Sequence, residues 1–181
     1  MTRIETLETD RLFIRELDYK DFDDIHRIKS NEEVVRYITW GPNDEIQTRK
    51  ALDKQIGFQE DLDRTKYVLG IVLKSIDQLI GNGLMSIKDN ETGEIGYFFH
   101  PEYWGKGFGT ETGRALIKFG FAKLNLHRII AMCDVENAAS IKILKKLGMR
   151  QEGHFIKDQK IRGVWRDNLL FALIREEYQY I

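Results

Sequence analysis

The stretch YFFHPEYWGKGFGTETG, residues 97–113, places three glycines within five positions, between an aromatic strand-like run and the start of a helix-like run. Glycines let the backbone turn tightly, and the first N–H groups of a helix have no partner inside that helix. The positive end of the helix lies behind these donors. Residues 104–110, here called the glycine loop, therefore predict an anion site suited to phosphate.

Two nucleotide-binding motifs and a purely structural turn fit the glycine loop less well. A nucleotide P-loop requires G-x-x-x-x-G-K-[ST], whereas here the lysine lies between glycines and Phe108 follows Gly107. A Rossmann fingerprint requires its first glycine directly after the first strand of a βαβ unit, whereas this loop follows four predicted strands. A structural turn is the remaining alternative, although turns seldom need Gly105, Gly107 and Gly109 together before a helix.

Hydrophobic periodicity on either side of the loop predicts the order strand, two helices, three strands, helix, strand, helix and two strands. The first helix shows Phe22, Ile25 and Ile28 on one face. The other segments are a helix carrying Leu52, Ile56 and Leu62 after a cap at Asn43 or Asp44, strands at 66–74, 78–87 and 94–100, a helix at 109–123, a strand at 128–135, a helix that Asn137 caps and Gly148 ends, and two strands within 152–174.

Length, composition and charge limit the class of protein. The chain has 181 residues, 42% hydrophobic and 31% charged, which predicts a single folded domain over residues 1–181. Lysine and arginine number 28 against 29 acidic residues, so we expect neither nucleic acid nor a membrane as partner. The single cysteine, Cys133, allows no internal disulfide, which favours the cytoplasm. The four histidines show no metal-ligand spacing, so no metal is expected.

Two segments together resemble a known family. PEYWGKGFGTE, residues 101–111, followed by NAASIKILKKLGM, residues 137–149, resembles the acetyl-CoA signature of the GNAT acetyltransferase superfamily. Its ribosomal-protein N-terminal (alanine/serine) acetyltransferase branch is the most similar. Trp104 stands where the superfamily pattern Q/R-x-x-G-x-G/A has Gln or Arg. The resemblance implies an α+β fold with a mixed central sheet of about seven strands, flanked by helices, in which the fourth and fifth strands splay apart.

The resemblance also implies a binding mode for acetyl-CoA. Its pantetheine arm would enter between the strands at 94–99 and 128–135, and loop amides would bind its pyrophosphate. The implied cofactor-binding residues are Phe98, Phe99, Trp104, Gly105, Lys106, Gly107, Phe108, Gly109, Thr110, Asn137 and Ser140.

Direct acyl transfer to an amine needs a base, an oxyanion donor and an acid for the leaving thiolate. The resemblance implies the N–H of Phe98 or Phe99 as oxyanion donor. Leu144 occupies the position of the tyrosine that serves many members as the acid, and Ser140 is the candidate instead. Glu94, acting through water, is the candidate base. Related enzymes use a glutamate in the loop before the last strand, where this chain has Gln159 next to Asp158.

The predicted activity is therefore acetyl transfer from acetyl-CoA to a primary amine. A protein or peptide N-terminus is the favoured acceptor, since its α-amine is already partly neutral at pH 7. A small amine such as a polyamine or aminoglycoside remains an alternative, as does an acyl-CoA-binding sensor with degenerate catalysis. An exposed sheet edge or Trp165 could support a homodimer.

Overall fold

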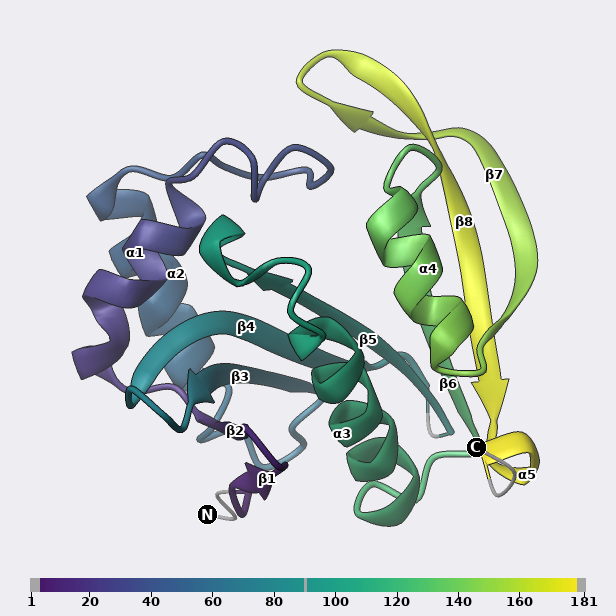
Figure 1. Cartoon of the computed structure of the whole chain (residues 1–181), viewed down its shortest axis with the longest axis horizontal. Coiled ribbons are helices and arrows are strands. Elements are labelled where there is room, and N and C mark those ends of the chain that lie inside the picture. The colour runs from purple at the N-terminus through teal and green to yellow at the C-terminus, as the bar shows by residue number, and fades with distance from the viewer. Residues whose placement is uncertain (1–3, 90, 179–181) are drawn as a thin grey trace.

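The computed structural model describes residues 4–89 and 91–178. Within these residues the chain forms one mixed sheet of eight strands in the order β1-β2-β3-β4-β5-β6-β8-β7 (Figure 1). The strands are β1 (Leu7–Glu8), β2 (Leu12–Glu16), β3 (Lys66–Leu73), β4 (Gln78–Ile87), β5 (Thr92–Phe99), β6 (Arg128–Asp134), β7 (Arg150–Ile161) and β8 (Val164–Ile174).

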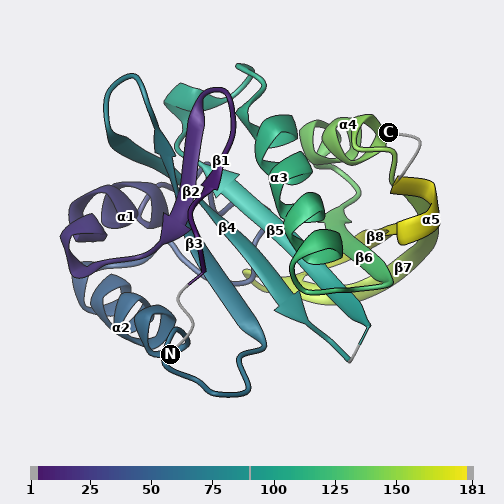
Figure 2. The same ribbon diagram turned by 90° about the horizontal axis from the view of Figure 1, so that it is seen from below.

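Helices cover both faces of the sheet, as Figures 1 and 2 show. α1 (Phe22–Lys29) and α2 (Glu45–Gly57) pack on one face, while α3 (Phe108–Ala122) and α4 (Ala138–Lys146) pack on the other. Each pair of helices encloses its own buried apolar cluster against the sheet. A short helix, α5 (Arg175–Tyr178), follows β8. No helix among the described residues is long and apolar enough to cross a membrane.

The centre of the sheet is held by a very short parallel pair. β5 and β6 pair at three positions, from Thr92 with Arg128 to Glu94 with Ile130. Beyond that point β6 continues its antiparallel pairing with β8 as far as Asp134, and β5 continues its pairing with β4 as far as Phe99. The two strands therefore splay apart, and we call the unpaired interval between 95–99 and 131–134 the wedge.

The predicted order of the longer elements is confirmed, and the splayed strands are the β5 and β6 of this structure. The sheet has eight strands rather than about seven, because the two residues of β1 pair with β2. Asp44 caps α2 by accepting a hydrogen bond from the N–H of Gln47 at 2.7 Å. The prediction that Leu62 belongs to the apolar face of this helix is wrong: α2 ends at Gly57, and Leu62 is 95% exposed.

Candidate functional site

The glycine loop connects β5 to α3 through a short 3-10 turn, Pro101–Tyr103. Gly105 and Gly107 both have left-handed backbones, with φ of 73° and 85°, a region that favours glycine strongly. Gly107 is the N-cap of α3, so residues 108–110 of the loop belong to the first turn of that helix. The indole Nε1 of Trp104 donates to the carbonyl of Phe99 at 2.8 Å, which ties the loop back to the end of β5.

The backbone amides of this loop are unused. In the part of the chain that the structure describes, the backbone N–H groups of residues 105–110 donate to no protein acceptor, whereas the neighbouring Trp104 and Glu111 amides bond to Pro101 and Gly107. Six consecutive donors thus lie at the N-terminus of a 15-residue helix. Such a set fits a diphosphate well, since charge-assisted hydrogen bonds contribute roughly 1.5–3 kcal/mol each.

The hydrogen-bonding pattern of β5 distinguishes the two predicted oxyanion donors, Phe98 and Phe99. Two backbone bonds show which residues of β5 face β4: Lys88 N donates to Thr92 O at 2.8 Å, and His100 N donates to Ile80 O at 3.0 Å. The β4–β5 register is continuous, so even-numbered residues bond to β4, while Tyr97 and Phe99 turn their N–H and C=O groups toward the wedge. The Phe98 amide is therefore directed toward β4, and the Phe99 amide is directed toward the wedge.

Glu94, Gly96 and Phe98 share the face of β5 on which α1 and α2 lie. The Phe98 ring contacts Trp40 edge to face, with centroids 5.4 Å apart. The Glu94 carboxylate forms an ion pair with Lys88. About 16 Å of strand separates Glu94 from Phe99, so no direct contact joins the predicted base to the predicted oxyanion donor. A side chain at Gly96 would meet no atom within 4 Å, so the strand face between them is open.

The far side of the wedge contains the residues predicted from α4. Asn137 caps this helix, since its side chain accepts from the Ser140 N–H at 3.1 Å. Burial raises the pKa of the Cys133 thiol to about 11, and the neighbouring Ser140 hydroxyl opposes that shift. The Ser140 side chain therefore lies next to Cys133 of β6. Leu144 lies in the buried core, so no hydroxyl occupies the tyrosine position.

An ion-pair network that the sequence did not predict lies across the wedge from Phe98. Arg166 donates to both carboxylate oxygens of Asp134, at 2.7 and 2.8 Å, and forms an ion pair with Glu136 at 2.8 Å. Burial raises the pKa of Asp134, but the bonds from Arg166 and from the Glu136 N–H outweigh it, and the pKa lies below its usual range. The partners are about 30 residues apart in sequence, so no local pattern could reveal them.

Residues 30–44, which we call the α1–α2 connection, reach across to this network. The guanidinium of Arg162 donates to the carbonyls of Val35, Arg36 and Gly41, at 2.8, 3.4 and 3.3 Å. The Tyr37 hydroxyl donates to the carbonyl of Glu136 at 3.4 Å. The β7–β8 hairpin and the loop before α4 therefore both hold the α1–α2 connection over the Phe98 face of the sheet.

We expected Gln159 and Asp158 in a loop before the last strand, and this prediction is wrong. They belong to β7, where the pairing with β8 shifts register between Phe155 and Gln159. Asp158 accepts a hydrogen bond from the Asn168 side chain at 2.8 Å, so it has a structural partner. Among the described residues, no group of three or more His, Cys, Asp or Glu side chains could hold a metal ion.

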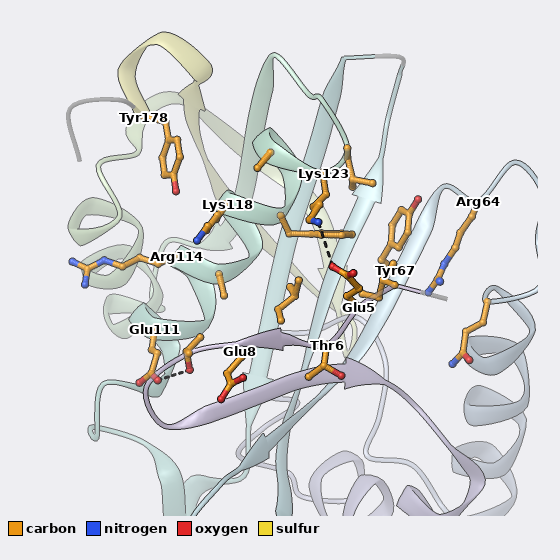
Figure 3. A pocket seen from close by; sticks show the side chains of 18 of the residues that line it. Glu5, Thr6, Glu8, Arg64, Tyr67, Glu111, Arg114, Lys118, Lys123 and Tyr178 are labelled. Carbon is orange, nitrogen blue, oxygen red and sulfur yellow. Dashed lines mark hydrogen bonds and ion pairs between the residues drawn. The ribbon is translucent and has the colours of Figure 1, made fainter. Parts of the chain in front are cut away.

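A groove lies beside the glycine loop, outside the wedge. It has a volume of about 1240 Å³ and lies between the N-terminal segment, residues 59–64 and the outer side of α3. Figure 3 shows Arg114, Lys118 and Lys123 on the helix wall, with Glu5 and Glu8 on the wall opposite. Gly107, Thr110 and Glu111 line the end of the groove that meets the glycine loop.

Comparisons with known proteins agree on one family. The family model described as Acetyltransferase (GNAT) domain matches residues 11–150. The chain is 35% identical over 173 residues to "Uncharacterized N-acetyltransferase YnaD" of Bacillus subtilis, covering 95% of this chain and 98% of that protein. It is 25% identical over 170 residues to spermidine N(1)-acetyltransferase of Escherichia coli, covering 91% and 87%.

Solved structures give the same fold. A GNAT-family acetyltransferase from Bacillus anthracis superposes with a TM-score of 0.86 at 32% identity, covering 95% of this chain and 99% of that one. RimL, a ribosomal alpha-N-protein acetyltransferase in complex with coenzyme A, gives a TM-score of 0.84 over 94% of this chain and 98% of that one. At 18% identity the likeness to RimL concerns the fold alone.

Proposed function

The chain belongs to the GNAT acetyltransferase family, and on that premise we propose that this N-acetyltransferase acetylates a protein or peptide N-terminal amine. Acetyl-CoA is the acetyl donor of the family. The observation that carries the proposal is the row of six unused amides at residues 105–110, which offers a diphosphate site at the start of α3, next to the splayed strands β5 and β6. We propose that residues 1–181 form one acetyltransferase domain, of which residues 1–3, 90 and 179–181 lie outside the described residues.

We propose that acetyl-CoA lies along the wedge. Amides of Gly105, Lys106, Gly107, Phe108, Gly109 and Thr110 would bind the diphosphate, with Trp104 fixing the loop. The pantetheine arm would pair with the backbone of Tyr97 and Phe99, as an added strand does. Asn137 would contact the same arm from the start of α4, next to its cap.

The proposed chemistry follows from this placement. The N–H of Phe99 would hold the oxyanion that forms when the amine attacks the thioester, while Phe98 would contribute its ring to the acceptor side. Ser140 would donate a proton to the departing thiolate, because Leu144 has none to give. Glu94 would accept the proton of the amine through water molecules along the open face at Gly96.

The acceptor is the part of the proposal with most alternatives. An α-amine with a pKa near 8 is partly neutral at pH 7, whereas lysine, with a pKa near 10.4, is not, so a remote base such as Glu94 suits an N-terminus. The 25% identity to spermidine N(1)-acetyltransferase supports a polyamine as the second candidate. An aminoglycoside acceptor and an acyl-CoA sensor with degenerate catalysis complete the alternatives.

Release of free thiol from acetyl-CoA tests these alternatives together. The assay uses panels of N-terminal peptides, polyamines and aminoglycosides at equal concentration. We expect peptides to give the highest kcat/KM. Faster turnover of spermidine would replace the N-terminal proposal by the polyamine one, and tight binding of acetyl-CoA without turnover of any amine would leave the sensor.

The role of Glu94 has its own test. Substituting Glu94→Gln should lower kcat/KM for the best amine by about 10- to 100-fold below the pKa of the amine, with less effect above it. Lys88→Met removes the ion-pair partner and keeps the carboxylate, so it should retain most activity. An unchanged pH–rate profile in Glu94→Gln would remove Glu94 from the mechanism.

We also propose a cytoplasmic homodimer. β7 is the outer strand of the sheet, and its hairpin with β8 exposes four large apolar side chains, Phe155, Ile156, Val164 and Trp165. Light scattering after size exclusion should give twice the chain mass, and Trp165→Glu should halve it. A monomeric wild type would refute the dimer without affecting the proposed reaction.

A further inference from the structure

Arg11 contacts the glycine loop from outside. It lies in the turn between β1 and β2, about 100 residues away in sequence. Its guanidinium donates to the Lys106 carbonyl at 3.0 Å and to the Glu111 carboxylate at 2.8 Å, and its Cζ lies 4.4 Å from the centre of the Phe108 ring. A single side chain therefore contacts the loop, the first residue of α3 and the first turn of that helix.

The Glu111 carboxylate is fixed by more than this ion pair. It also accepts from the Thr9 hydroxyl at 2.6 Å and from the Arg11 backbone N–H at 2.9 Å. Burial raises the pKa of Glu111, but these hydrogen bonds outweigh it and leave the pKa below its usual range. The Glu111 side chain is 16% exposed and that of Arg11 is 47% exposed, so the carboxylate is the more buried partner of the pair.

The contact with Lys106 determines the direction of an amide. In a trans peptide the C=O of one residue and the N–H of the next point in opposite directions. Because Arg11 holds the Lys106 carbonyl, the Gly107 N–H points away from Arg11, and among the described residues it has no protein acceptor. The positive charge of Arg11 is already paired with Glu111, so geometry rather than charge is its contribution.

We infer that Arg11 and Glu111 form a clamp that positions the glycine loop for the diphosphate of acetyl-CoA. Arg11 is thus a positioning residue for the cofactor, and the inference rests on the proposed function. Removal of the clamp should weaken acetyl-CoA binding and leave the acyl-transfer step unaffected once the cofactor is saturating.

The chain offers a matched control in Arg64. This residue forms the same three kinds of contact: a two-pronged ion pair with Glu16 at 2.6 and 3.1 Å, a bond to the Lys66 carbonyl at 2.9 Å, and a ring contact with Tyr67 at 4.4 Å. It lines the same groove but touches no part of the glycine loop. Its ion pair is more buried than that of Arg11, so its loss should cost at least as much stability.

The test is calorimetric titration of acetyl-CoA, with steady-state kinetics, on wild type, Arg11→Met and Arg64→Met. We expect Arg11→Met to raise the Kd and the KM for acetyl-CoA about tenfold with kcat within twofold, and Arg64→Met to leave the Kd unchanged. Arg11→Lys keeps the charge without the planar fork, so it should resemble Arg11→Met. Glu111→Gln should also weaken binding, and the double variant should lose less than the two single losses combined.

Each other outcome overturns a distinct statement. A wild type that does not bind acetyl-CoA would refute the proposed function itself. If the wild type binds and Arg11→Met binds equally well, the clamp is refuted while the function stands. Full recovery in Arg11→Lys would replace positioning by charge attraction. Should Arg11→Met fail to fold, Glu111→Gln with Arg64→Met gives the same comparison.

Discussion

The glycine loop and the α1–α2 connection lie on opposite sides of the same wedge and are built in opposite ways. The loop presents its own backbone N–H groups, and its carbonyl at Lys106 is held by Arg11. The connection presents side chains such as Trp40 and Tyr37, and its backbone carbonyls are held by Arg162. On the proposed binding mode, main-chain geometry would recognise the cofactor and side chains would recognise the acceptor.

The strongest test of that contrast is a pair of glycines with the same backbone. Gly107 and Gly163 have φ of 85° and 84°, so a side chain strains both alike, by about 1 kcal/mol. Gly107→Glu adds a negative charge beside the unused amides and should weaken acetyl-CoA binding more than about 100-fold in calorimetry. Gly163→Glu, in the β7–β8 turn, should bind normally. Equal losses in both variants would show that strain, not the diphosphate site, is responsible.

The face of the sheet under the α1–α2 connection also has a buried cation. Lys29 is 3% exposed, its Nζ donates to Gln55 at 3.3 Å and lies 5.5 Å from the centre of the Trp40 ring. Burial lowers its pKa from 10.5 to about 8. The unfolded chain binds this proton more tightly than the folded chain does. The destabilisation caused by the Lys29 charge should therefore be complete below pH 8 and should decline between pH 8 and 10.5, so that the free energy of unfolding rises over that interval.

Lys29→Met should therefore stabilise the protein by about 2 kcal/mol at pH 7 and remove that rise. Urea unfolding at pH 7, 9 and 10 measures both effects, with the exposed Lys50→Met as control. A wild-type free energy of unfolding that falls between pH 8 and 10 would contradict the lowered pKa of Lys29.

Arg162 tests whether the α1–α2 connection serves the acceptor. Arg162→Met removes all three bonds to carbonyls of the connection and should raise the KM for the amine about tenfold, at an unchanged Kd for acetyl-CoA. Lys160→Met alters the same hairpin without touching the connection and should leave both constants unchanged. If Arg162→Met changed only the Kd for acetyl-CoA, Arg162 would support cofactor binding and not acceptor binding.

The smallest effect is expected at Trp104. Trp104→Phe removes the bond from the indole to the Phe99 carbonyl and should weaken acetyl-CoA binding about threefold to fivefold. Trp165→Phe, an exposed ring outside the site, is the matched control. An unchanged Kd for Trp104→Phe would show that Arg11 alone suffices to hold the loop.

The sequence predicted the features that depend on local backbone geometry and missed those that depend on long-range side-chain contacts. The strand and helix order, the cap at Asn137 and the glycine loop depend on local backbone preferences, which short stretches of sequence record. The choice of Phe99 over Phe98 required the register of β4 and β5, a long-range property. Arg11, Arg166 and Arg162 act on partners about 100, 30 and 120 residues away, and a single arginine in a sequence does not indicate its partner. Leu62 was misassigned because apolar spacing alone does not reveal that a helix ends at Gly57.

The three residue pairs between β5 and β6 have a consequence for turnover. These pairs are the strand pairing that joins two parts of the sheet, here called leaves: β1 to β5 and β6 to β8. On the proposed binding mode, the pantetheine arm supplies the pairing that the wedge lacks. Departure of coenzyme A would then leave the leaves joined mainly by helix packing, and amide exchange at Tyr97 and Phe99 should accelerate at that moment. The catalytic cycle would thus alternate between a stiff sheet and a compliant one.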